Sequence, residues 1–244
     1  MLLRAAFPRT TKRMRAMLIA AILAAATHAL AETTPTPSDR ATSTHDFADV
    51  DYWHKVFDDP KRDAWQKPEA LIAALQIAPG STVADLGAGT GYLTARLAKA
   101  VGPHGTVLAV ETEPTLVAYL RQRAASEQTP NVVPVLTPAD RPRLPRGGVD
   151  LIVILDTYHH LDRRHVYLPH LVRALRRGGR VAVIDWQAGQ LPEGPPPDHK
   201  LPRQQVVDEM RAAGFALAAE PAVLPYQYVL IFGVAGQPQG GARQ

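Results

Sequence analysis

The 244-residue chain contains no cysteine. This absence excludes disulfide bonds, thiolate metal ligands, a cysteine nucleophile and a lipid anchor attached through an N-terminal cysteine. The body of the chain also lacks an excess of charge, although the sequence pI is near 9.5. Five of the 27 basic residues and none of the 23 acidic ones lie in residues 1–31. The rest is therefore nearly neutral and gives no sign of a nucleic-acid groove.

The N-terminal apolar run is too short for a transmembrane helix. Ala16–Ala26 has 11 residues, whereas about 20 are needed to cross a bilayer. The run follows a basic stretch and precedes the small-residue sequence Ala29-Leu30-Ala31, which together form the three parts of a secretory signal. We therefore expect a signal peptide at residues 1–31 and an exported protein, periplasmic or secreted, without a stable membrane span. A leader that stays uncleaved and tethers the chain to the membrane is the alternative.

The remaining composition is that of a globular protein, with 46% hydrophobic and 20% charged residues. The length allows one large domain with appendages. Residues 32–46 are rich in Thr, Pro and Ser and predict a disordered linker, and residues 237–244 predict a disordered tail. A single domain is thus expected over residues 47–236.

Within this domain, short apolar segments alternate with helical ones. Such alternation is typical of a parallel sheet covered by helices. The apolar run 149–155 is nearly continuous, as in a central strand that is buried on both faces. The predicted strands are 82–86, 106–110, 132–136, 149–155, 181–186, 215–220 and 226–234, and the predicted helices are 68–76, 90–101, 114–126, 164–176 and 203–213.

A glycine loop, Gly87-Ala88-Gly89-Thr90-Gly91, follows the first of these strands. Glycines let the backbone turn tightly and approach a nucleotide-type ligand closely. The dinucleotide fingerprint GxGxxG is not met, because Tyr92 stands where its last glycine would fall. Asp85, two residues before the loop, would repel a pyrophosphate and favour a cation. S-adenosylmethionine carries an ammonium and a sulfonium and no phosphate, so it suits this loop better than NAD.

The second predicted strand ends at Glu111, 20 residues after Gly91. At this distance an acid normally accepts hydrogen bonds from ribose hydroxyls. Glu111 is therefore the predicted ribose ligand.

These segments resemble class I S-adenosylmethionine-dependent methyltransferases. VADLGAGTGYLTARLA is similar to their first motif and VLAVETEP to their second-strand motif, and VDLIVILDTYHHL and LRRGGRVAVID continue the resemblance, which extends from about Arg62 to Phe232. The later segments are similar to small-molecule methyltransferases of the ubiquinone-biosynthesis type. RDAWQKPEALIAAL, TPADRPRLP, the YHH triplet and DHKLP resemble a subgroup of exported bacterial methyltransferases.

The resemblance implies an α/β fold, a Rossmann-like three-layer sandwich. Its seven-stranded sheet is mostly parallel, with an antiparallel last strand in a C-terminal hairpin. It implies that Asp85 and the glycine loop hold the methionine part of S-adenosylmethionine, that Glu111 holds the ribose and that Asp140 faces the adenine. The family's usual Gly-Asp pair at that last loop is Ala139-Asp140 here. The expected cofactor contacts are Asp85, Gly87, Ala88, Gly89, Gly91, Glu111, Thr112, Asp140 and Asp156.

The methyl acceptor is expected beyond the carboxyl ends of the strands, where open parallel sheets bind ligands. This places Asp156, Tyr158, His159 and His160 at the edge of the cofactor site. Either histidine could act as a base toward a hydroxyl acceptor, oriented by Asp156 or Tyr158. The alternative is that these residues only pack against the sheet.

Trp186 and His199 are the predicted substrate contacts. His199 lies in a proline-rich loop, residues 191–202, which is either a substrate wall or a plain surface connection. Trp53 and Trp65 either cover the cofactor or belong to the core. We expect no metal site, because His165 and His170 are five residues apart and diverge by about 140° on a helix.

The sequence therefore predicts an exported methyltransferase that uses S-adenosylmethionine and acts on a small molecule. A nicotinamide-dependent oxidoreductase and a non-catalytic module of the same fold are the alternatives.

Overall fold

The structure, a computed structural model, describes residues 39–43 and 46–238. The prediction of a signal peptide at residues 1–31 falls outside the described residues. So do most of the predicted linker and residues 239–244 of the predicted tail. In the described part of the chain, no helix is long and apolar enough to cross a membrane.

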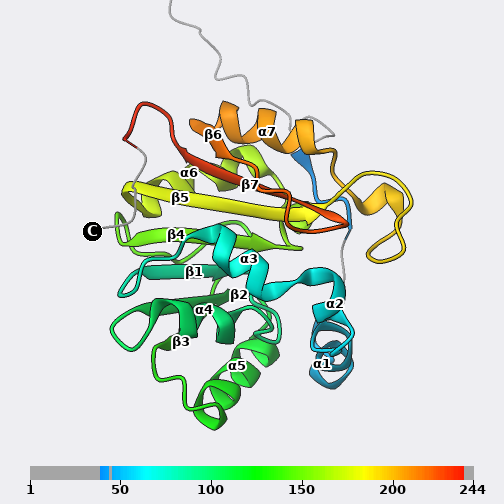
Figure 1. Ribbon diagram of the computed structural model, residues 1–244, viewed down its shortest axis with the longest axis vertical. Helices are drawn as coiled ribbons and strands as arrows, with labels where there is room; N and C mark the ends of the chain where they lie inside the picture. The colour runs from blue at the N-terminus through cyan, green and yellow to red at the C-terminus, as the bar shows by residue number, and fades with distance from the viewer. Residues whose placement is uncertain (1–38, 44–45, 239–244) are drawn as a thin grey trace, which may run out of the picture. The chain divides into compact units, whose positions relative to one another are not determined.

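A seven-stranded sheet forms the centre of the domain (Figure 1). Its spatial order is β3-β2-β1-β4-β5-β7-β6. The first five strands in this order pair in parallel, and β7 pairs antiparallel with both β5 and β6. The predicted fold class is confirmed, including the antiparallel last strand. The strands are β1 Thr82–Leu86, β2 Thr106–Glu111, β3 Val132–Leu136, β4 Val149–Leu155, β5 Leu175–Trp186, β6 Phe215–Ala219 and β7 Gln227–Val234.

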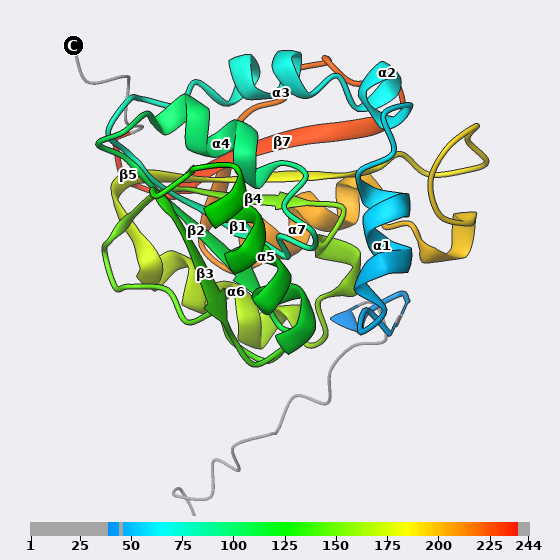
Figure 2. The ribbon, with the colours of Figure 1, turned by 90° about the horizontal axis from the view of Figure 1, so that it is seen from below.

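Helices cover both faces of the sheet (Figure 2). Successive side chains of a strand point to opposite faces, so β4 sends Ile152 and Ile154 into one apolar cluster and Val153 and Leu155 into another. Helices α6 (Arg164–Ala174) and α7 (Arg203–Ala212) pack on the first cluster, and α3 (Pro68–Leu75) and α4 (Thr94–Val101) on the second. The remaining helices are α1 Val50–Phe57, α2 Arg62–Gln66 and α5 Pro114–Ser126, with short 3-10 helices η2 Tyr158–His160 and η3 Pro197–His199.

Two boundaries differ from the prediction by more than two residues. Helix α4 begins at Thr94 rather than residue 90, because Thr90–Leu93 form turns that continue the glycine loop. Strand β5 begins at Leu175, so Gly178 and Gly179 lie inside a strand and do not end a helix. An irregularity in the β4–β5 pairing accommodates them. Helices α1 and α2 were not predicted at all.

Residues 39–43 form a short strap against the domain, although they were expected in a disordered linker. The Thr42 amide donates to the carbonyl oxygen of His159 at 2.9 Å. The Thr42 hydroxyl donates to the carbonyl oxygen of His199 at 2.6 Å. The strap therefore joins the turn after β4 to the proline-rich loop. Residues 39–43 of the predicted linker thus have polar groups with partners in the domain.

Candidate functional site

The glycine loop connects β1 to α4 and has little room for side chains. Gly87, Gly89 and Gly91 have φ angles of +76°, +57° and +92°, a region that favours glycine. A Cβ added to Gly87 would lie 2.4 Å from Cγ2 and Oγ1 of Thr157, the residue after Asp156. The loop is thus pressed against the segment that follows β4. This brings the predicted cofactor residues and the predicted acceptor side together.

Asp85 lies near the end of β1 under this loop and is only 2% exposed. Its Oδ2 accepts a hydrogen bond of 2.6 Å from the Thr94 hydroxyl. Its Oδ1 accepts no hydrogen bond among the described residues and is not sealed from solvent. Burial raises the pKa of Asp85 to about 6, opposed by the Thr94 hydrogen bond and the charge of Arg62 and assisted by the charge of Glu111. A ligand that brings a positive charge to Oδ1 would offset this cost of ionisation.

The raised pKa of Asp85 leads to a prediction about stability. At neutral pH the ionised carboxylate opposes folding, and this cost disappears as the pH falls through about 6 toward 3.8, because the folded state takes up the proton first. Asp85→Asn should therefore stabilise the ligand-free protein at pH 7.5 by up to about 3 kcal/mol, with a smaller gain near pH 4. Thermal unfolding at both pH values measures this, with the exposed Asp208→Asn as control. An Asp85→Asn protein that is less stable at pH 7.5 would contradict it.

Glu111 ends β2 beside the glycine loop. Its Oε2 accepts a hydrogen bond of 2.9 Å from the amide of Gly89. Its Oε1 accepts from the amides of Thr112 at 2.6 Å and Glu113 at 3.2 Å. The carboxylate thus ties the loop to the end of β2, where the ribose was predicted. Thr112 is exposed at the same edge.

Asp140 lies in the loop after β3 and is half exposed. The Nη1 atom of Arg141 lies 3.9 Å from its Oδ2. The loop begins beside the predicted ribose site, because the Thr137 amide donates to the carbonyl oxygen of Glu111 at 2.9 Å. The contact of Asp140 with adenine stays a prediction.

Asp156 follows β4 with a φ of +52°, and both of its oxygens are engaged. Arg62 of α2 donates to Oδ2 at 2.9 Å, and Gln227 of β7 donates to Oδ1. Burial raises the pKa of Asp156 to about 6, and the charge of Asp185 adds to this while that of Arg62 opposes it. Asp156 therefore orients Arg62, and its hydrogen bonds within the described residues go to Arg62 and Gln227 rather than to the histidines of the YHH triplet.

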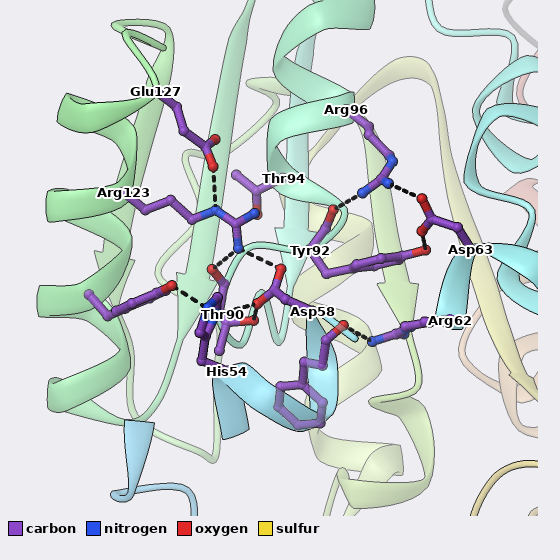
Figure 3. Close-up of polar contacts among 12 residues, drawn as sticks. His54, Asp58, Arg62, Asp63, Thr90, Tyr92, Thr94, Arg96, Arg123 and Glu127 are labelled. Atoms are coloured by element: carbon purple, nitrogen blue, oxygen red, sulfur yellow. Dashed lines mark hydrogen bonds and ion pairs between the residues drawn. The ribbon is translucent and has the colours of Figure 1, made fainter. Parts of the chain in front are cut away.

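The segment α1–α2 covers the glycine loop and is fixed to it by polar contacts (Figure 3). Asp58, after α1, accepts from the Thr90 hydroxyl at 2.6 Å and from Arg123 of α5 at 2.7 Å. Asp63 of α2 accepts from the Tyr92 hydroxyl at 2.6 Å and from Arg96 at 2.8 Å. These contacts place the unpredicted helices directly at the predicted cofactor site.

Aromatic side chains of α1, together with Phe47 just before it, complete this cover. The ring of Phe57 lies 3.4 Å from where a Cβ on Gly89 would be. Trp53 stacks on Phe57 with ring centroids 5.0 Å apart, and Phe47 lies 4.7 Å from Trp53 and 5.8 Å from the ring of His160. Trp53 is therefore part of the cover. Trp65 of α2 packs on Trp186 instead, with ring centroids 5.2 Å apart.

The two histidines of η2 have different surroundings. His159 is buried, and its Nδ1 lies 2.9 and 3.0 Å from the two carboxylate oxygens of Asp185. His160 is partly exposed, and its Nδ1 lies 3.1 Å from both the hydroxyl and the carbonyl oxygen of Ser43. Asp185 was not singled out from the sequence, although its place at the end of a central apolar strand marks it.

Tyr158 does not belong to this site. It is fully buried in the apolar cluster under α6 and α7, and its hydroxyl donates to Glu209 at 2.9 Å. The predicted role of Tyr158 in orienting a histidine is therefore wrong, because the side chain points into the core.

Trp186 is 5% exposed. It lies against Trp65 on one side, and a Cβ on Gly194 of the proline-rich loop would lie 2.5 Å from its ring. The predicted contacts of Trp186 and His199 with a substrate stay predictions. In residues 39–43 and 46–238, no group of three or more His, Asp or Glu is placed to hold a metal ion.

The strand order, the glycine loop and the acid that ends β2 define the class I methyltransferase fold. Residues 83–179 match the family model of the methyltransferase domain. The chain therefore contains a class I S-adenosylmethionine-dependent methyltransferase domain.

The chain is also similar to known methyltransferases in structure and in sequence. A SAM-dependent methyltransferase from Aquifex aeolicus superposes with a TM-score of 0.72 at 26% identity, over 78% of this chain and 98% of that one. The ubiquinone/menaquinone biosynthesis C-methyltransferase UbiE of Burkholderia multivorans is 30% identical over 117 residues, 47% of each chain. An arsenite methyltransferase of Halobacterium salinarum is 30% identical over 118 residues, 48% of this chain and 29% of that protein. The chain thus spans less than half the length of these two curated relatives.

Proposed function

We propose that the protein transfers the methyl group of S-adenosylmethionine to a small molecule. The observation that carries this is the charge of the loop: two carboxylates, Asp85 and Glu111, lie at the ends of β1 and β2 around backbone turns of glycine. Carboxylates suit an ammonium, a sulfonium and ribose hydroxyls, and they oppose the phosphates of NAD. When bound, S-adenosylmethionine supplies an electrophilic methyl group. The residues of the chain then have to align the acceptor and exclude water.

A small-molecule acceptor is favoured by the relatives that act in quinone biosynthesis. Arsenite is a poorer candidate, because the chain has no cysteine and so offers no thiolate to a soft acceptor. The aromatic cover formed by Phe47, Trp53 and Phe57 suits an acceptor with an apolar face.

Calorimetric titration of the full chain with S-adenosylmethionine, S-adenosylhomocysteine and NAD tests this function. We expect micromolar binding of the first two ligands and none of NAD. Glu111→Ala should weaken cofactor binding by roughly 1.5 to 3 kcal/mol, because it removes a charged hydrogen-bond acceptor. Glu69→Ala, an exposed acid on α3, is the matched control. Tighter binding of NAD would favour an oxidoreductase, and no binding of any of the three would favour a non-catalytic module.

We further propose that the protein is exported. The proposal rests on the basic, apolar and small-residue segments of residues 1–31. Because S-adenosylmethionine is expected to be made in the cytoplasm, an exported enzyme needs a supply of it in the cell envelope. A reporter enzyme fused to the C-terminus should fractionate with the periplasm or the medium, and a fusion without residues 1–31 should stay in the cytoplasm. A full-length fusion that is cytoplasmic would overturn export.

A further inference from the structure

Asp185 and His159 form a buried pair at the carboxyl ends of the neighbouring strands β5 and β4. Asp185 has no exposed surface. Besides the ring of His159, it accepts hydrogen bonds from the amide of His159 at 3.1 Å and from the amide of Trp186 at 2.8 Å. The carboxylate is therefore fixed by the backbone of both strand ends, and it fixes the imidazole in turn.

The pairing determines which nitrogen of His159 is free to act. A carboxylate only accepts hydrogen bonds, so Nδ1 carries the proton and Nε2 carries the lone pair. Among the described residues Nε2 has no hydrogen-bond partner and is not sealed from solvent. An imidazole held in this way presents a single basic atom.

The charges around His159 favour proton uptake at that atom. Burial lowers its pKa, but the charge and the hydrogen bond of Asp185 outweigh this, and Asp156 adds to them, so the pKa lies above 6.5. Arg164 of α6 opposes the shift. His160 is the other titratable neighbour, with ring centroids 4.1 Å apart.

The turn that carries His159 lies against the loop that is predicted to hold the methyl donor. Thr157, two residues before His159, is the residue against which Gly87 of the glycine loop is pressed. On the other side, the ring of His160 meets Phe47 of the aromatic cover edge to face, 5.8 Å between centroids. An acceptor between the cover and the glycine loop would have η2 as its neighbour.

We propose that His159, positioned by Asp185, is the general base of the reaction, and that the acceptor is a small molecule with a phenol-type hydroxyl. This rests on the proposed methyl transfer. The hydroxyl oxygen forms a bond to the methyl carbon, the carbon–sulfur bond breaks with its electron pair left on sulfur, and the hydroxyl proton passes to Nε2. The buried carboxylate of Asp185 balances the imidazolium charge, and the proton then leaves to water.

The first test needs no acceptor. Nitrogen-15 NMR of the full chain with bound S-adenosylhomocysteine should show His159 protonated at Nδ1, with a pKa above 6.5 that falls in Asp185→Asn. The partly exposed His170 on α6 provides the control: His170→Gln should leave the His159 signals unchanged. An Nε2–H tautomer, or a His159 pKa that Asp185→Asn does not lower, would overturn the role of Asp185.

The second test identifies the acceptor atom. The protein is incubated with S-adenosylmethionine labelled with carbon-13 in its methyl group and with low-molecular-mass compounds extracted from cells that express it. We expect the label to be bound to oxygen. His159→Gln should transfer ~100-fold less label with its cofactor affinity unchanged. In Asp185→Asn the pH–rate profile should shift to lower pH. A carbon-, nitrogen- or sulfur-bound label, or no transfer by a protein that binds the cofactor, overturns the hydroxyl acceptor. Failure to bind S-adenosylmethionine would instead overturn the proposed function.

Discussion

Gly87→Ala should destabilise the protein by about 2 to 5 kcal/mol and abolish cofactor binding. Two costs add up. A left-handed backbone costs a residue with a Cβ roughly 1–2 kcal/mol, and Gly87 has a φ of +76°. The new Cβ would also lie 2.4 Å from two side-chain atoms of Thr157, and overpacking of this kind costs about 1–3 kcal/mol. Urea unfolding and calorimetric titration with S-adenosylhomocysteine measure the two effects.

Gly80→Ala is a matched control for this substitution. Gly80 has nearly the same φ, +78°, but nothing lies within 4 Å of its added Cβ. Gly80→Ala should lose only the stability that the left-handed backbone costs, roughly 1–2 kcal/mol, and should keep full cofactor affinity. The double variant Gly87→Ala/Thr157→Gly should recover part of the loss, because the two residues are in contact. Equal destabilisation by the two alanine substitutions would show that Thr157 does not limit the loop.

Arg164→Ala should destabilise the protein by about 3–5 kcal/mol, the usual cost of removing one partner of a buried ion pair. The Arg164 side chain has no exposed surface. It donates to both oxygens of Glu209, at 2.7 and 3.1 Å, and to the carbonyl oxygen of Arg40 in the strap at 2.8 Å. The substitution leaves Glu209 without its cation and removes one of the anchors of the strap. Thermal and urea unfolding measure the loss.

Arg203→Ala provides the comparison. Arg203 also pairs with a carboxylate, that of Glu220, but both side chains are more than a third exposed. Surface pairs contribute about 0–1 kcal/mol, so this variant should unfold close to the wild type. The double variant Arg164→Met/Glu209→Leu should regain most of the stability, because apolar groups replace both charges. If Arg164→Ala lost as little stability as Arg203→Ala, the Arg164–Glu209 pair would contribute nothing to the stability of the fold.

Local patterns made most of the sheet predictable. The apolar run at residues 149–155 and the glycine loop carry their information within a few neighbouring residues, and both lie where the sequence placed them. The cover over the loop is different, because its contacts join residues far apart, such as Arg62 and Asp156, 94 positions away. The sequence around Arg62 contains no local pattern that would predict Asp156 as its partner.

The same limit explains the histidine turn. The sequence predicted that His159 would lie at the carboxyl end of the sheet, and it does. It also offered Tyr158 as an orienting group. Whether a tyrosine faces a site or the core depends on what packs over it, here Glu209 of α7, 51 residues later. Asp185 comes to His159 through the pairing of β4 with β5, in which Leu155 lies opposite Ile184.

The position of β7 determines when the domain can form. This strand, Gln227–Val234, is inserted between β5 and β6 and pairs with both. The sheet is therefore incomplete until residues 227–234 have been synthesised. Before then β5 has only β4 beside it, and β6 has no neighbouring strand. Pairing over such sequence distances is slow. In a nascent chain that ends before Gln227, the sheet therefore stops at β5, and the edge of β5 to which β7 later binds stays open.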